Sequence, residues 1–227
     1  MKKIQIYRKF AQIVFFVLLV IGVYMNARIG IMFLLPGAFI FGNFFCGWVC
    51  PYGTIQELFS KLGKKLFKKQ FKMPIGIQKY LQYSKYVLMI ISLTGIISIV
   101  FDSINGYKTF MSIFSNGIAL SVASVIMISF IVISMFFERP FCNYFCIEGV
   151  KFGVFSLTRI FSIKRNEETC VGCKKCDKVC PMNINISVKE QIRNGQCINC
   201  FECMSACPVD NTITYGRVKL SFKIVKK

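Results

Sequence analysis

The chain has 227 residues and a formal net charge of +19, and 55% of its residues are hydrophobic, including 24 Phe. With only 17% charged residues, this composition is too apolar for an ordinary soluble domain. The basic residues lie between apolar runs rather than along one face with stacking aromatics, which argues against a nucleic-acid partner. Histidine is absent, which excludes histidine-ligated haem, mixed Cys/His zinc sites and a histidine general base. Metal chemistry would therefore depend mainly on the 12 Cys.

Four apolar runs predict four transmembrane helices, because roughly 20 apolar residues span a bilayer. We place them at about 10–27, 29–46, 80–101 and 118–137. Lysine and arginine concentrate before the first run, between the second and third, and after the fourth. The positive-inside rule then predicts a multi-pass cell-membrane protein, in contact with lipid, whose termini are both cytoplasmic. Cysteines facing that reducing compartment favour metal ligation over disulfides.

Two Cys-x-x-x-Cys pairs close the second and fourth apolar runs: Cys46 with Cys50, and Cys142 with Cys146. The segments FGNFFCGWVCPYGTIQELF and FERPFCNYFCIEGVKFGVF align without gaps, which predicts a duplicated unit with parallel copies. Since positions i and i+4 share a helix face, we expect the four thiolates of the two pairs to hold one iron–sulfur site. It would be a third site, beside the two predicted below for the C-terminal part of the chain. Other metal or dithiol chemistry, and packing of small buried cysteines, remain alternatives. The second pair lacks a proline like Pro51, so equivalence of the halves is open.

The stretch between the second and third runs predicts a basic amphipathic helix over 54–72, TIQELFSKLGKKLFKKQFK. It would lie on an anionic lipid surface or dock an acidic ferredoxin. Glu57, Glu138 and Glu148 are candidate proton acceptors for quinol oxidation, and ion pairing with Arg139 or with lysines is the competing interpretation.

Residues 166–227 are polar and rich in cysteine, and we expect a separate α+β domain there, following a four-helix membrane domain at 1–165. Two copies of C-x2-C-x2-C-x3-C-P, 27 positions apart, resemble bacterial two-[4Fe-4S] ferredoxins. In those proteins the fourth cysteine of each motif ligates the other cluster. The resemblance implies one cluster on Cys170, Cys173, Cys176 and Cys207, and another on Cys197, Cys200, Cys203 and Cys180. Four-cysteine zinc ribbons are the alternative, although they usually join two C-x2-C knuckles across a longer gap.

The segments CGWVCP at 46–51 and RPFCNYFC at 139–146, followed by the double ferredoxin motif, resemble a known family. It comprises membrane-bound iron–sulfur proteins related to the quinol dehydrogenase subunit of periplasmic nitrate reduction. Similar modules occur in the nitrous oxide reductase regulator. The resemblance implies electron transfer at a membrane, often linked to quinol oxidation, with the terminal chemistry in a partner.

We therefore expect a membrane-bound electron-transfer protein with two [4Fe-4S] clusters and a third centre at the paired cysteines. It would pass single electrons between a quinol pool or soluble donor and a partner reductase. The alternatives are a copper-handling or oxidoreductase-maturation protein, and a membrane sensor whose clusters report redox state.

Overall fold

The computed structural model describes residues 3–24, 35–68, 70–93 and 122–218. Its helices are α1 (Lys3–Tyr24), α2 (Leu35–Phe41), α3 (Pro51–Phe67), α4 (Ile75–Leu93), α7 (Val122–Ile133), α8 (Pro140–Tyr144), α9 (Ile147–Phe155), α10 (Lys175–Lys178) and α11 (Glu202–Ala206). Phe45–Val49 forms a π-helical turn and Ser156–Thr158 a 3₁₀ turn. The strands β1 (Phe161–Arg165) and β2 (Ile213–Arg217) pair antiparallel.

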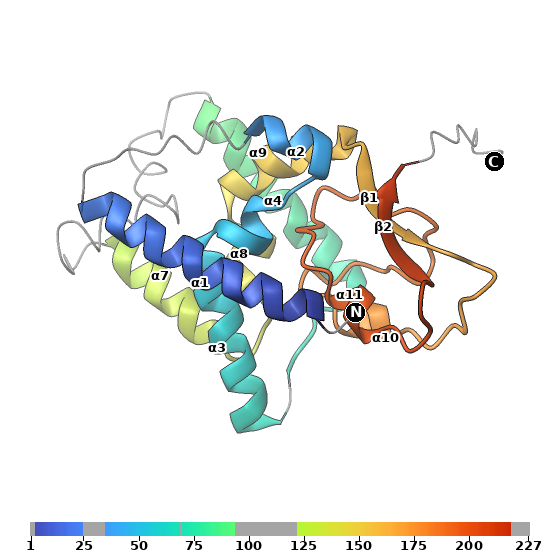
Figure 1. The fold of residues 1–227 in the computed structure, drawn as a ribbon. Helices are drawn as coiled ribbons and strands as arrows, with labels where there is room; N and C mark the ends of the chain where they lie inside the picture. Colours follow the sequence, from blue (N-terminus) through green and yellow to red (C-terminus); the bar gives the residue numbers. More distant parts are fainter. Residues whose placement is uncertain (1–2, 25–34, 69, 94–121, 219–227) are drawn as a thin grey trace.

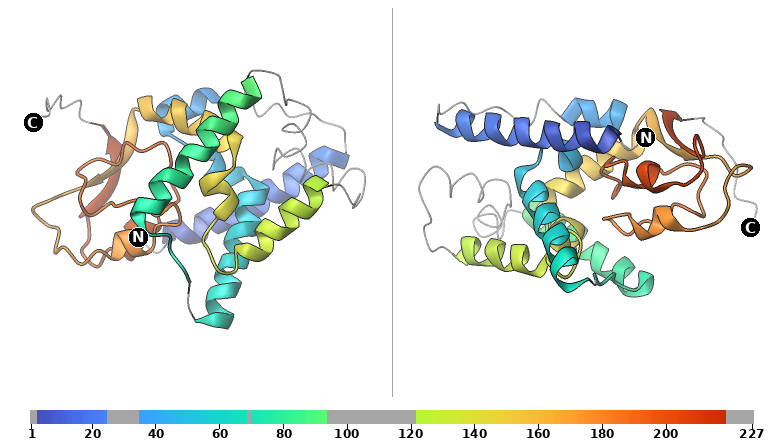
Figure 2. Two further views of the ribbon diagram at one scale, coloured as in Figure 1. Left: turned by 180° about the vertical axis from the view of Figure 1, so that it is seen from behind. Right: turned by 60° about the horizontal axis from the view of Figure 1, so that its bottom comes forward.

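The helices that precede β1 occupy one side of the protein, and the small sheet, the cysteine-rich loops and the short helices α10 and α11 occupy the other (Figure 1). The first residues of α1 lie beside α11, so the beginning of the chain packs against its last part (Figures 1 and 2). β1 precedes the predicted boundary at residue 166, yet it pairs with β2. The C-terminal sheet therefore uses residues from both sides of that boundary.

The prediction of four membrane-spanning helices is wrong for the part of the chain that the structure describes. None of its helices combines the length and the apolar character needed to cross a bilayer. α2 has 7 residues and α7 has 12, which is short of a span. α1 and α4 are longer, but they carry Arg8, Gln78 and Lys85, all buried against the protein. The predicted multi-pass cell-membrane localisation, with both termini and the ferredoxin domain cytoplasmic, depends on those spans and is therefore wrong for the same described residues. The remaining parts of the predicted spans, at 25–34, 94–101 and 118–121, lie outside the described residues.

The predicted basic helix between the second and third runs corresponds to α3, but its orientation differs from the amphipathic expectation. The helix begins with Pro51 in its first turn and ends at Lys68, whose φ of 54° is left-handed. Its buried face carries Gln56, Ser60 and Gly63, while its leucines are exposed. A β-carbon on Gly63 would lie 2.0 Å from the carbonyl oxygen of Met135, so the absence of a side chain permits this close approach.

Close backbone contacts join the helical side to the cysteine-rich side. A β-carbon on Gly47 would lie 2.2 Å from the carbonyl oxygen of Ile198. Gly153 and Gly195 face each other in the same way, each carbonyl oxygen occupying the place of the other's side chain. The Trp48 indole donates a hydrogen bond of 2.9 Å to the carbonyl oxygen of Asn199. The two sides therefore meet along the segment 195–199 without room for solvent between the glycines.

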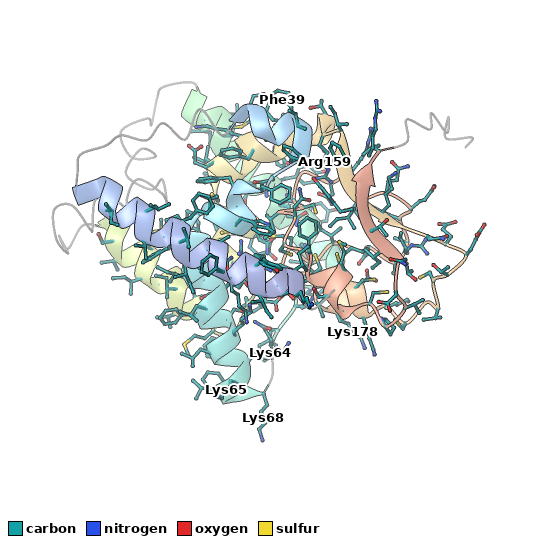
Figure 3. The ribbon with its side chains drawn as sticks, viewed as in Figure 1. Phe39, Lys64, Lys65, Lys68, Arg159 and Lys178 are labelled. Atoms are coloured by element: carbon teal, nitrogen blue, oxygen red, sulfur yellow. The ribbon has the colours of Figure 1, made fainter. Side chains whose placement is uncertain are left out.

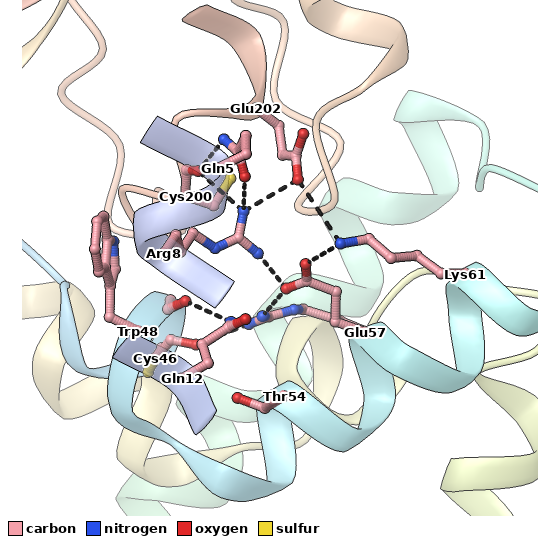
Figure 4. A network of polar contacts seen from close by, with 12 residues as sticks. Gln5, Arg8, Gln12, Cys46, Trp48, Thr54, Glu57, Lys61, Cys200 and Glu202 are labelled. Atoms are coloured by element: carbon pink, nitrogen blue, oxygen red, sulfur yellow. Dashed lines mark hydrogen bonds and ion pairs between the residues drawn. The ribbon is translucent and has the colours of Figure 1, made fainter. Parts of the chain in front are cut away.

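A buried ion network links the same two sides (Figure 4). The Glu57 carboxylate accepts hydrogen bonds from Arg139, at 2.7 Å, and from Arg8. Both guanidinium side chains are 1% exposed. Burial alone would raise the pKa of Glu57, but the charges of Arg139, Arg8 and Lys61 hold it well below its usual range. Two buried cations thus share one ionised carboxylate, and Arg8 also pairs with Glu202 at 3.1 Å.

Each arginine of this network also holds a cysteine backbone in place (Figure 4). Arg139 donates to the carbonyl oxygen of Cys46 at 2.8 Å. Arg8 donates to the carbonyl oxygen of Cys200 at 3.0 Å. The network therefore fixes the first cysteine pair relative to the second ferredoxin motif.

Removal of the Glu57 charge should destabilise the protein, because it leaves the buried Arg139 without a counter-charge and leaves Arg8 with Glu202 alone. We expect Glu57→Gln to lower the free energy of unfolding by about 3–5 kcal/mol at pH 7 in anaerobic denaturant titrations. A depressed carboxyl pKa contributes stability above the unfolded pKa of about 4.3 and loses it only as pH falls through the folded value. The difference between variant and wild type should therefore stay constant from pH 7 to pH 5.

Glu167→Gln is the matched control, since the Glu167 carboxylate is 65% exposed and pairs with Arg165 at the surface. We expect it to cost at most about 1 kcal/mol. Equal effects of the two substitutions would contradict the role given to Glu57.

A side chain at Gly63 should also be costly, because the carbonyl group of Met135 cannot move aside without shifting the backbone. We expect Gly63→Ala to lower the free energy of unfolding by about 1–3 kcal/mol. Gly76→Ala in α4 is the control, since no atom lies within 4 Å of the added β-carbon. A Gly63 variant as stable as the Gly76 variant would show that α3 can move away from this contact.

Candidate functional site

The two cysteine pairs meet around one cavity. Cys46, Cys50, Cys142 and Cys146 all line a cavity of about 30 Å³. Burial raises the pKa of Cys146 well above its usual value, and the neighbouring Cys142, Cys46 and Cys50 raise it further. Burial likewise raises the pKa of Cys142 to about 12. The structure thus brings together the four residues that the sequence pairs only two by two.

Each pair spans a break between two helical segments rather than one continuous helix. Cys46 lies in the π-helical turn and Cys142 in α8, whereas Cys50 and Cys146 are the N-caps of α3 and α9. The extended cap conformations are closely similar, with φ −63° and ψ 114° at Cys50 and φ −73° and ψ 109° at Cys146. The missing proline after Cys146 therefore does not change the conformation of the cap residue, although Cys46 and Cys142 lie in turns of different kinds.

Backbone groups approach the second sulfur of each pair. The peptide N–H of Gly149 donates to Cys146 Sγ at 3.3 Å. Burial raises the pKa of Cys50, while a hydrogen bond from the backbone of Gly53 and the charge of Arg139 oppose the rise. Such N–H groups at a helix start favour a thiolate, which is the form that binds metal.

The structure also gathers the four cysteines assigned to the second ferredoxin cluster. Cys180, Cys197, Cys200 and Cys203 are all buried. Burial raises the pKa of Cys203, and Cys200, Cys197 and Cys180 raise it further. Cys180, from the first motif, thus lies with the three cysteines of the second motif, which is the crossed arrangement implied by the ferredoxin resemblance.

The cysteines assigned to the first cluster are more exposed. Cys176 is buried, Cys170 and Cys207 are half-buried, and Cys173 is exposed. Within the described ranges, no three cysteine or carboxylate side chains lie close enough to hold a single metal ion. A four-iron cluster binds each cysteine at a different iron, so its ligands stand further apart than those of one ion. The ligand assignments of both clusters stay predictions.

The cavity and the second cysteine group are in contact. Cys46, which lines the cavity, packs against the core that contains Cys197 and Cys200. Ile198, between those two cysteines in the chain, also lines the cavity. Centres held by these two groups would lie on the two sides of this contact.

Two functional side chains of this region escaped the sequence reasoning. Arg8 and Lys85 were counted as charges flanking apolar runs, but both are buried. Lys85 lines the cysteine cavity and donates a hydrogen bond to the side-chain oxygen of Gln196. A lone lysine within a predicted apolar helix was the only available signal.

A second cavity, of about 140 Å³, lies beside the ion network. It is lined by Arg8, Glu57, Lys64, Glu138, Arg139 and Pro181, among others. Glu138 Oε2 is buried and has no hydrogen-bond partner among the described residues. Burial raises the pKa of Glu138, against the charges of Lys72 and Lys64. Of the three acidic candidates, Glu57 and Glu148 form ion pairs, with Arg139 and Lys151 respectively.

Two family models match the chain, and together they cover all twelve cysteines. A "4Fe-4S binding domain" matches residues 25–70 and 120–159, which hold both Cys-x-x-x-Cys pairs. A "4Fe-4S dicluster domain" matches residues 162–214, which hold the double ferredoxin motif. No solved structure matches the chain. The iron–sulfur interpretation of the tail is therefore confirmed over the zinc alternative.

Curated relatives agree with these models. An uncharacterized protein of Methanocaldococcus jannaschii is 36% identical over 83% of this chain and 79% of its own length. The putative electron transport protein YccM of Escherichia coli is 32% identical over 77% of this chain and 51% of its own. The ferredoxin-type protein NapH of Haemophilus influenzae is 27% identical over 60% of this chain and 47% of its own, which confirms the predicted resemblance. The chain belongs to the family of 4Fe-4S ferredoxin-type electron-transport proteins.

Proposed function

We propose that the cavity formed by the two cysteine pairs binds a third iron–sulfur cluster, which exchanges single electrons with the second ferredoxin cluster. The donor set fits such a group, because four cysteines converge on one cavity and peptide N–H groups approach their sulfurs. A cluster would supply one-electron chemistry with little bond rearrangement. The protein's part is to hold the ligands, exclude solvent and place the two groups next to each other.

The observation that carries this proposal is the packing of Cys46 against the core of the second ferredoxin motif. Electrons entering at the cavity would need to cross only the contact around Gly47 and Ile198. We infer that the chain passes single electrons between a quinol or soluble donor and a partner reductase. The terminal chemistry would belong to that partner.

The second cavity is the place we propose for the head group of a quinol. Oxidation of a quinol releases two electrons and two protons, so a proton acceptor is needed beside the electron acceptor. Glu138, whose Oε2 is buried without a hydrogen-bond partner in the part of the chain that the structure describes, fits that role, whereas Glu57 pairs with two arginines. Arg139 lines this cavity and also donates a hydrogen bond to the backbone of Cys46. The proposed proton acceptor, Glu138, and the proposed electron acceptor, the four-cysteine centre, would therefore lie on the two sides of Arg139.

Lipid is the proposed source of such an apolar donor. α1 exposes a series of apolar side chains that a lipid surface would cover, namely Ile6, Phe10, Ile13, Val17, Leu18 and Ile21. The lysines at the far end of α3, including Lys64, Lys65 and Lys68, would favour an acidic partner or anionic head groups (Figure 3).

Iron content tests the third cluster. Anaerobically purified protein should hold about twelve iron atoms per chain rather than about eight, since each cubane has four. Cys142→Ser should remove about four iron atoms and one electron paramagnetic resonance (EPR) signal, because serine replaces a thiolate ligand. Cys173→Ser is the control, expected to remove a different signal while leaving the cavity's signal intact.

An unchanged iron count and spectrum in Cys142→Ser would contradict the third cluster. Copper bound by the same four cysteines, with electron transfer unaffected by their loss, would favour the metal-handling alternative.

Glu138 provides a test of quinol oxidation. We expect Glu138→Gln to slow reduction of the clusters by a soluble quinol analogue by about 100-fold, in the range typical of a lost general base. Reduction by dithionite, which delivers no proton, should be unchanged. Stopped-flow absorbance of the clusters measures both rates. The exposed Glu168 provides the control, because Glu168→Gln should alter neither rate, and a Glu138 variant with wild-type quinol kinetics would contradict the site.

A further inference from the structure

Lys85 is a buried ammonium group beside the four-cysteine cavity. Its side chain comes from the middle of α4 and is 2% exposed. It lines the same cavity as Cys46, Cys142 and Cys146. Burial lowers the pKa of Lys85 to about 8, and negative charge on those three cysteines acts against that fall. Its hydrogen-bond acceptor is the neutral side-chain oxygen of Gln196.

A buried cation requires a counter-charge, and here no carboxylate supplies it. The buried cations Arg8 and Arg139 share Glu57, and Arg8 also pairs with Glu202. Among the described residues, no aspartate or glutamate forms an ion pair with Lys85. A lone buried lysine is costly in an apolar interior. Glu148 also lines the cavity, but its carboxylate pairs with Lys151 at 2.8 Å, so the cysteines are the other source of negative charge in the cavity wall.

A four-iron cluster with four thiolates would provide that charge. By general iron–sulfur chemistry its oxidised form carries about two negative charges, and reduction adds one more. A fixed cation close to the sulfurs stabilises the reduced form more than the oxidised form. The cation would therefore raise the reduction potential of the centre it faces.

Gln196 fixes the position of the Lys85 ammonium group. Its side chain accepts from Lys85, and its backbone N–H donates to Asn194 Oδ1 at 2.9 Å. Cys197, the first ligand of the second ferredoxin motif, follows directly in the chain. The ammonium group is thus anchored at the boundary between the cavity and the second cysteine group.

We propose that Lys85 is the charge-compensating residue of the four-cysteine centre and raises its reduction potential relative to that of the second ferredoxin cluster. This inference rests on the proposed third cluster. In this proposal a residue of α4, a helix that contributes none of the ligands, determines how an electron is distributed between the four-cysteine centre and the second ferredoxin cluster.

The test compares reduction potentials of single-residue variants of the full-length protein. Lys85→Met removes the charge and keeps the length, Lys85→Arg keeps the charge, and Lys65→Met removes an exposed lysine of α3 as the matched control. Potentials are measured by EPR-monitored redox titration, with the cavity signal identified as the one lost in Cys142→Ser. Iron is counted in every sample.

We expect Lys85→Met to lower the equilibrium constant for reduction of the cavity centre about tenfold, which is 59 mV for a one-electron couple. Lys85→Arg and Lys65→Met should stay within about twofold of wild type, and the ferredoxin signals should not move. Lys85→Met and Lys85→Gln could instead both lose only the cavity's iron while Lys85→Arg retains it. That result would also support the proposal, because it shows that the centre needs a positive charge at this position in order to bind.

Two failures are distinguishable. About twelve iron atoms with an unmoved potential in Lys85→Met would overturn the role of Lys85 and leave the third cluster intact. About eight iron atoms in wild type, unchanged in Cys142→Ser, would overturn the third cluster and the role of Lys85 with it.

Discussion

The shared carboxylate of Glu57 is the interaction on which the arrangement of the cysteines depends. It holds Arg8 and Arg139, and these in turn hold the carbonyl groups of Cys200 and Cys46. The participating residues come from α1, α3, the start of α8 and the C-terminal part of the chain. Two guanidinium groups at this depth would repel each other without the anion between them. The Glu57 carboxylate, together with Glu202 on Arg8, therefore fixes the register between the first cysteine pair and the second ferredoxin motif.

Cysteine spacing predicted much of the candidate site. The double motif implied that Cys180 crosses to the second group, and the structure places it there. The gap-free match of the two pairs predicted that they converge, and they line one cavity. Spacing was informative because thiolate ligation of a cluster tolerates few patterns. The same reasoning left the proline question open, and the cap angles answer it, since an extended cap is accessible to cysteine whether or not proline follows.

Hydropathy was less informative, and for an identifiable reason. The apolar runs leave Arg8 and Gln78 just outside the predicted spans and Lys85 inside one, whereas the structure buries each of them against a distant segment. Arg8 reaches partners 49 and 194 residues away, and Lys85 reaches one 111 residues away. Such pairings are not encoded in local composition. They explain why helices with apolar sequences form polar contacts here, and why exposed leucines line the outer face of α3.

The glycine contact between Gly153 and Gly195 has a consequence for assembly. The carbonyl oxygen of each glycine lies close to the position that a side chain on the other would take, and Gly195, Gln196 and Ile198 line the four-cysteine cavity. The C-terminal part of the chain therefore completes the wall of the cavity. The proposed cluster would be enclosed only when this segment packs against α9.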